Sequence, residues 1–214
     1  SLSLSLYRAA MKGPGLFSDI GKKGRDLLEK DYNYDQKLTV STRTASGLGL
    51  TTNAVKKGGL YVGDITTQFK YGETTIDVKV DTESKVTSTV TRAELFPCTK
   101  AMTTFKNSDL NYGKLEVQYF HDHASVTGAV TLKQPPNVDI SGTLGSHGIV
   151  FGAEAGFDSV LGTFTKYNAG LSLKKSQTIV SLQLVDKGDM LRASYVHHLD
   201  GKQTSAAVGE ITRK

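Results

Sequence analysis

From residue 36 to the end, the chain alternates apolar and polar residues with a period of two. Ile76, Val78 and Val80, for example, alternate with charged residues at the intervening positions. Successive side chains of a β-strand point to opposite faces, so this period predicts strands with one apolar and one polar face. The same pattern recurs at 115–119, 138–144, 149–157 and 191–195.

Groups of turn residues interrupt the alternation at fairly even intervals. Counting one break at each group predicts about fourteen strands. Short, even connections are typical of hairpins, which indicates an antiparallel meander. The clearest expected breaks are at 45–47, 57–59, 71–73, Pro97, Asn111, 135–136, 146–148, 187–189 and 200–201.

Residues 14–29 precede the strands and have a helical period. Apolar residues recur there at the spacing of one helix face, with basic residues between them. Gly21 and Gly24 each cost about 1 kcal/mol relative to alanine inside a helix. We therefore predict an amphipathic helix that is marginal alone and needs a surface on which to dock.

Hydropathy leaves two architectures open. There is no run of eighteen or more apolar residues, so the sequence offers no transmembrane helix. A transmembrane barrel strand needs only about ten alternating residues, and a mean hydropathy of -0.26 is compatible with one. The apolar faces could meet in the core of a soluble sandwich, or they could face lipid while the charged faces line a watery lumen.

Charge and candidate chemistry exclude several classes of protein. The net charge is +5, but the basic residues are spread over the strands without an aromatic-lined patch, so no nucleic-acid site is expected. Neither a nucleophile elbow nor a phosphate-binding glycine loop is present, and we expect neither an enzyme nor a cofactor. His121 and His123 flank Asp122, but no third ligand is evident, so we predict a polar hairpin turn and no metal site. A single cysteine, Cys98, rules out an internal disulfide.

Several segments resemble one known family. Residues 11–32 (MKGPGLFSDIGKKGRDLLEKDY) resemble the N-terminal helix of mitochondrial voltage-dependent anion channels, in their plant branch. The resemblance covers residues 11–214. Further matching stretches follow in the same order: GDITTQFKYG at 63–72, KLEVQYFHDHASVTGAV at 114–130, FTKYNAGLSL at 164–173, DKGDMLRASYVHHLD at 186–200 and TSAAVGEITRK at 204–214.

The resemblance implies an all-β fold: a transmembrane antiparallel β-barrel of the eukaryotic porin type, with the amphipathic helix in its lumen. The domain organisation then expected is a leader of unassigned role at 1–10, the helix and a linker at 11–35, and barrel strands at 36–214. Barrels of this family have nineteen strands, so about five are expected to be absent from a chain truncated at its C-terminus.

The resemblance also implies a voltage-gated, weakly anion-selective diffusion channel of the mitochondrial outer membrane. Its partners would be membrane lipids and, as permeants, ATP, ADP, phosphate and small ions; homo-oligomers are compatible with it. The alternatives are a non-conducting fragment of such a channel and a soluble all-β binding protein.

Basic groups in a water-filled pore raise the local concentration of anions, which is the physical basis of anion preference. The family's nucleotide-contact motif is represented here only by Lys100, in the stretch Pro97-Cys98-Thr99-Lys100. The residues expected to line the pore and attract anions are Lys22, Lys23, Arg25, Lys79, Lys114 and Arg192.

Overall fold

A computed structural model describes residues 13–29, 36–44, 47–57, 60–93, 95–106, 109–133, 135–200 and 205–214. The expected leader at 1–10 and the expected breaks at 45–46, 58–59 and 201 lie outside the described residues.

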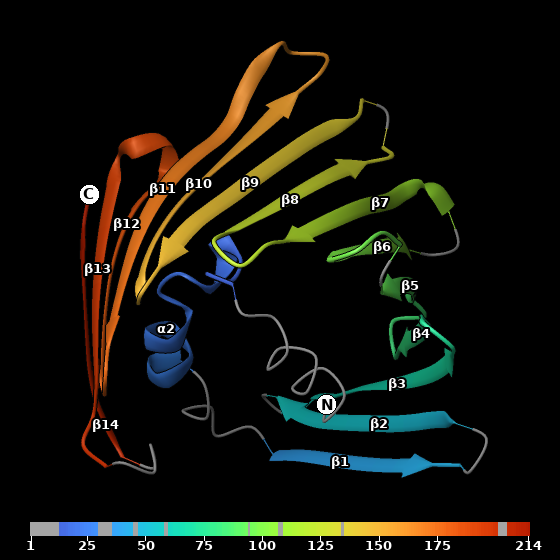
Figure 1. Ribbon diagram of the computed structural model, residues 1–214. Helices are drawn as coiled ribbons and strands as arrows, with labels where there is room; N and C mark the ends of the chain where they lie inside the picture. The colour runs from blue at the N-terminus through green and yellow to red at the C-terminus, as the bar shows by residue number, and fades with distance from the viewer. Residues whose placement is uncertain are drawn as a thin grey trace. The chain divides into compact units, whose positions relative to one another are not determined.

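The described elements are two short helices, fourteen strands and a further 3-10 turn, which confirms the predicted strand number (Figure 1). Consecutive strands are hydrogen-bonded in the order β1 to β14, and their pairing is antiparallel. The elements are η1 (Phe17–Asp19), α2 (Lys22–Glu29), β1 (Gln36–Arg43), β2 (Leu48–Lys57), β3 (Leu60–Tyr71), β4 (Thr74–Asp81), β5 (Val86–Ala93), β6 (Thr99–Lys106), β7 (Asp109–Phe120), β8 (Ala124–Thr131), β9 (Asn137–Ser146), β10 (Ile149–Asp158), β11 (Thr163–Lys175), β12 (Thr178–Val185), η2 (Asp186–Gly188), β13 (Met190–His198) and β14 (Ala206–Arg213).

Most of the expected breaks fall between strands. The Gly72 turn separates β3 from β4, and His147-Gly148 separates β9 from β10. The break expected at Asn111 is wrong, because this residue lies inside β7. Asparagine favours turns but is tolerated in a strand whose neighbours supply the pairing, so its presence alone misplaced the boundary.

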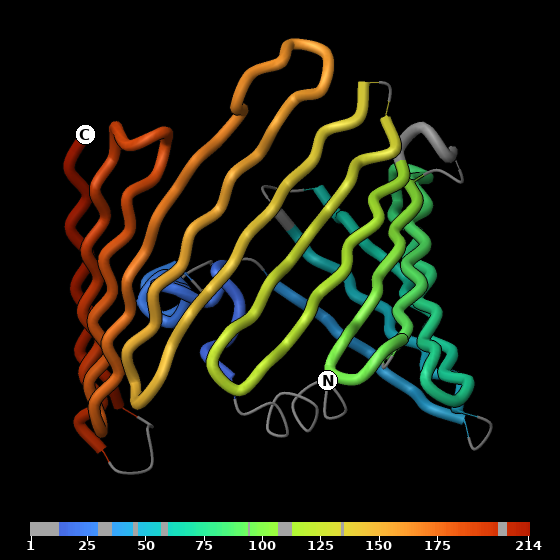
Figure 2. Tube along the Cα trace, turned by 45° about the horizontal axis from the view of Figure 1, so that its top comes forward, coloured from blue at the N-terminus to red at the C-terminus, as the bar shows by residue number. Residues whose placement is uncertain are grey.

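The chain divides into two compact units, which are described separately. Unit 1 contains residues 1–32, 118–128 and 138–214, and unit 2 contains residues 33–117 and 129–137. Strands β9 to β14 and both N-terminal helices therefore belong to unit 1, whereas β1 to β6 belong to unit 2 (Figure 2).

Burial in unit 1 is inverted relative to a soluble protein. Large apolar side chains on one face of the strands are exposed, including Ile140 (57%) and Phe151 (58%). Polar side chains on the other face are buried, including Thr143 (2%) and Ser181 (3%). An apolar face of this extent on a folded sheet marks a surface that meets lipid or a partner. We call the two sides of the strands the apolar face and the polar face.

The N-terminal segment forms two short helices, not the single continuous helix expected over 14–29. The break falls at Gly21, whose φ of +68° is a left-handed conformation that a helix interior does not allow. Among the described residues, no helix has the length and apolarity needed to cross a bilayer.

A β-bulge interrupts the pairing of β10 with β11. Thr165 and Lys166 both occur opposite Gly156, because the next register pair joins Phe157 to Phe164. The two phenylalanine rings of that pair meet edge to face, with centroids 5.7 Å apart. The bulge therefore shifts the alternation of faces by one residue along β11.

Candidate functional site: a helix docked on the polar face

The first part of the site is an apolar contact between η1 and the strands. Phe17 is 6% exposed and Ile20 is 3% exposed, and both lie over glycines of the polar face. A Cβ added at Gly152 would lie 2.7 Å from a ring carbon of Phe17, and one added at Gly170 would lie 3.2 Å from Ile20. The two strand glycines therefore make the space in which these side chains are buried.

The helix α2 approaches the wall through its own glycines. Gly24 is buried, and a Cβ there would lie 3.2 Å from the Ser194 side chain. Leu27 and Leu28 remain 40% and 39% exposed. The expectation that the helix needs a surface is confirmed in unit 1, where it contacts β13 and β14, but of α2 only Gly24 is buried.

Hydrogen bonds from β12 hold the junction between η1 and α2. The side-chain amide of Gln183 donates to the carbonyl oxygen of Ile20 over 2.9 Å, and its Oε1 accepts from Arg25 Nη1 over 2.9 Å. Gln183 is 5% exposed; its bond to Ile20 is buried, and its bond to Arg25 is partly buried. Buried polar groups require such partners, which makes this glutamine a specific anchor for the helix.

A second anchor holds the start of the segment. The Gly15 carbonyl oxygen accepts hydrogen bonds from the Ser125 and Thr143 hydroxyl groups, each over 2.5 Å. Both hydroxyl residues are 2% exposed. The chain before η1 is therefore fixed to β8 and β9 before the helix reaches β12.

The three strand residues expected to attract anions are each paired with a carboxylate. Lys79 Nζ lies 3.3 Å from Asp64 Oδ1, and Lys114 Nζ lies 2.9 Å from Glu116 Oε2. Arg192 Nε lies 3.3 Å from Glu210 Oε1. Each pair is close to neutral when seen from a distance, so these residues add less to the field than their number suggests.

The three basic residues of α2 that were expected to attract anions differ in their partners. Lys22 Nζ lies 4.0 Å from Asp19 Oδ1, and Arg25 is bonded to Gln183. Partial desolvation beside the strands, and then the nearby ammonium group of Lys174, lower the pKa of Lys23. Neither Lys23 nor Lys174 forms a salt bridge within the described part of the chain. The structure thus brings two uncompensated positive charges together beside the helix.

Sequence reasoning missed Lys174, although a signal for it exists. Lys174 follows Asn168 and Gly170 at even positions of β11, and the register pairs Gly170 with Gly152 of the polar face. The parity of β11 places Lys174 on that face. Its proximity to Lys23 depends on where the helix docks, which the strand pattern does not encode.

Two candidates remain, Lys100 and the histidine-containing turn at residues 121–123. Lys100 stands near the start of β6, opposite Ala93, in unit 2. Residues 121–123 form the turn between β7 and β8, and the rings of His121 and His123 have centroids 6.3 Å apart. No group of three possible metal ligands occurs among the residues that the structure describes.

These observations define a class of protein. In unit 1 the apolar side chains point outward into the surroundings, and the polar side chains are buried under a helix. This is the inside-out arrangement of a transmembrane β-barrel wall, whose outer face meets lipid and whose inner face lines a lumen.

Comparison with known proteins agrees with this class. The family model described as eukaryotic porin matches residues 13–213. The chain is 58% identical to mitochondrial outer membrane protein porin 2 of Arabidopsis thaliana over 203 residues, 95% of this chain and 74% of that protein. It is 55% identical to mitochondrial outer membrane protein porin 5 of Oryza sativa subsp. japonica over 205 residues, 96% of this chain and 74% of that protein. It is 43% identical to the outer plastidial membrane protein porin of Pisum sativum over 204 residues, 95% of this chain and 74% of that protein.

The chain belongs to the eukaryotic porin family. It is a β-barrel diffusion channel for metabolites, assigned to the mitochondrial outer membrane, and not an enzyme.

Proposed function

We propose that this porin is a voltage-gated, weakly anion-selective channel, and that its permeants include ATP, ADP, phosphate and small ions. The observation that carries the proposal is the pair formed by Lys23 and Lys174. The strand lysines at 79 and 114 are neutralised by carboxylates, whereas this pair is not. Uncompensated positive charge beside the helix raises the local concentration of anions without excluding cations, which accounts for a weak preference.

The proposed voltage dependence rests on the charges of the same region. Moving one elementary charge through a membrane potential of about 100 mV changes the energy by about 2.3 kcal/mol. Lys22, Lys23 and Arg25 lie on a short segment that is attached to the wall by local contacts. A shift of this segment would therefore couple pore charge to voltage. Lys100 as a nucleotide contact and self-association as homo-oligomers remain predictions.

The test is a measurement of reversal potential across a planar bilayer that separates two concentrations of KCl. The double variant Lys23→Gln/Lys174→Gln should lose most of the anion preference while the single-channel conductance persists. Lys85→Gln is the control for loss of a positive charge away from the helix, because Lys85 lies in the exposed β4–β5 turn beside Glu83; it removes one charge where the double variant removes two.

An unchanged reversal potential in the double variant would show that other groups set the selectivity. A conductance that stays constant over the whole voltage range in the unmodified protein would contradict voltage gating separately, since it leaves the selectivity result untouched.

A further inference from the structure

The apolar face of unit 2 carries very few charges. Among the described side chains of β1 to β6, those that share a face with Val40, Ile65 and Val90 include only two charged residues, Lys56 and Arg92. Each of them is the next-to-last residue of its strand. A charge on the lipid side of a barrel is destabilising near the membrane centre and tolerated near the interface. The positions of these two residues therefore indicate the two levels at which the strands leave the hydrocarbon.

Strand β3 provides a measure of the distance between these levels. Tyr61 lies opposite Lys56, whose Nζ is 5.6 Å from the centre of the tyrosine ring. Tyr71, at the other end of β3, shares a row with Arg92. Ten residues at about 3.3 Å each span about 33 Å, or about 25 Å along the membrane normal at a strand tilt of about 40°. This equals the height of about 25 Å expected for the apolar band of a membrane barrel.

The surroundings of Arg92 leave its guanidinium group open to the membrane. Thr74 of β4 and Ala101 of β6 are its direct neighbours in the row, and both are small. Arg92 is exposed, and within the described residues it has no ion pair or hydrogen-bond partner. Tyr71 (78% exposed) ends the row on one side, and Phe96 (67% exposed) follows in the next turn. An unpaired arginine thus lies in a row that ends at the exposed Tyr71, four residues before the exposed Phe96.

We propose that Arg92 binds the phosphate group of an anionic phospholipid on the outer surface of the barrel. A guanidinium group presents two parallel N–H donors that match two phosphate oxygens. The side chain of Thr74, directly opposite, carries a hydroxyl group within reach of the same phosphate. Tyr71 contributes an amphipathic ring of the type that gathers at membrane interfaces.

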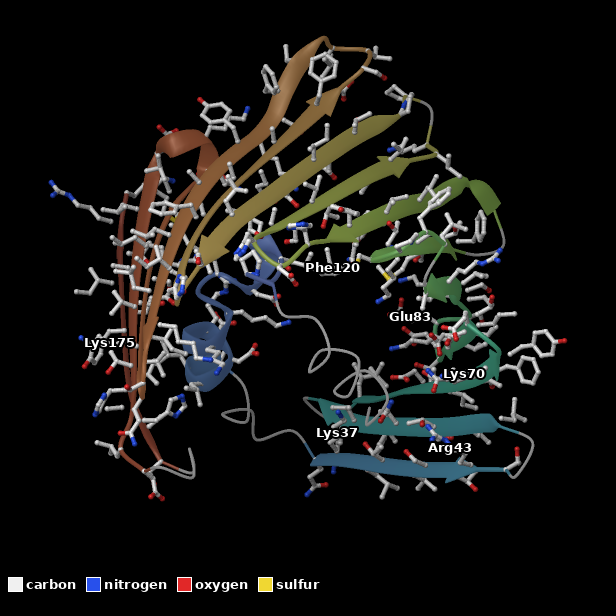
Figure 3. All side chains as sticks on the ribbon, in the orientation of Figure 1. Lys37, Arg43, Lys70, Glu83, Phe120 and Lys175 are labelled. Atoms are coloured by element: carbon white, nitrogen blue, oxygen red, sulfur yellow. The ribbon has the colours of Figure 1, made fainter. Side chains whose placement is uncertain are left out.

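The chain offers a matched control in Lys70. This residue precedes Tyr71 at the same end of β3, is exposed, and lies on the opposite face (Figure 3). Lys70→Gln removes one positive charge at the same strand end but leaves the lipid-facing row unchanged. Arg92→Gln removes the charge from that row, and Arg92→Lys keeps the charge but loses the bidentate geometry.

The experiment measures retained phospholipid after the full chain is purified from mixed detergent micelles that contain phosphatidylcholine and a minor fraction of phosphatidylinositol. The unmodified protein should be enriched in phosphatidylinositol, and Arg92→Gln should reduce this enrichment about fivefold, the effect expected of one basic residue at an anionic surface. Lys70→Gln should retain the full enrichment, and Arg92→Lys should fall between the two. A circular dichroism spectrum with unchanged β-structure shows that each variant is folded.

Equal losses in Arg92→Gln and Lys70→Gln would overturn the proposal, because net charge alone would then explain retention. No enrichment in the unmodified protein, or full enrichment in a folded Arg92→Gln variant, would overturn it as well. All three results are independent of ion selectivity.

Discussion

Lys23 shows how the environment changes the role of a single residue. Its pKa is lowered by partial desolvation and by Lys174, so it loses its charge at a lower pH than an ordinary lysine does. The lowered pKa also means that the charged form opposes folding slightly, and this opposition disappears as the pH rises through the pKa. The anion preference of the channel should depend on the charge of Lys23 and not on the stability of the fold.

We therefore expect the anion preference to weaken with rising pH, beginning at a lower pH than the titration of ordinary lysines would cause. Reversal potentials across a planar bilayer at several pH values would measure this change. The Lys23→Gln variant should show a smaller dependence over the same range. A dependence of equal size in that variant would assign the titration to another group.

The sequence predicted the residue types on the polar face but not their partners. Alternation places Lys79 on a charged face, and the structure then pairs it with Asp64 of the preceding strand. Which residues stand opposite each other depends on the register between strands, and turn residues fix that register only to within a residue or two. The difference between a free charge and a neutralised one was therefore not readable from the pattern.

At the level of elements, the strands were more predictable than the helix. The groups of turn residues gave their number, and the period of two gave their faces, because one side of every strand must be apolar for a barrel wall. The helix was expected to be continuous, and the glycines at 21 and 24 were treated only as weak points. The structure gives them another role, since Gly21 turns the chain and Gly24 allows close approach to Ser194.

Close approach predicts that the docked helix is sensitive to a single methyl group. In Gly152→Ala, the added Cβ would overlap the Phe17 ring, an overpacking that typically costs about 1–3 kcal/mol. The helix should loosen, and trypsin should cut faster at Lys22, Lys23 and Arg25 while the strands remain protected. The rate of cleavage in detergent micelles measures the effect.

Gly128→Ala serves as the comparison, because nothing lies within 4 Å of a Cβ at Gly128 and the residue is likewise in a strand. Equal cleavage rates in the two variants would show that the glycine contact does not hold the helix in place.

For the whole molecule, the sequence left open which side of the strands faces outward. Alternation is the same in a soluble sandwich and in a membrane barrel. Burial decides it, since Ile140 and Phe151 are exposed while Thr143 and Ser181 are buried. The distribution of buried and exposed side chains therefore excludes a soluble all-β binding protein. The alternation along the sequence does not show which face is buried.

This distribution predicts that an arginine substitution has different effects at two adjacent positions of β9. Ile140→Arg places a charge on the lipid face near the middle of the strand, which should cost about 2–4 kcal/mol and reduce insertion into phospholipid vesicles. Ser141→Arg places the same side chain on the polar face and should insert normally. The folded fraction after dilution from urea into vesicles would measure both.

If both variants insert normally, or if neither inserts, the two faces of β9 do not meet lipid and lumen as the burial pattern indicates.

The bulge in β11 has a consequence for insertions and deletions. Before it, Phe164 shares the apolar face with Phe157; after it, that face holds Tyr167, Ala169, Leu171 and Leu173. Removing Thr165 would leave one residue opposite Gly156 and keep every other side chain of the strand on its present face. Removing a residue such as Ala169 would instead exchange the faces on one side of the gap. A deletion of Thr165 should therefore be tolerated by β11, because every remaining side chain stays on the face that it has now.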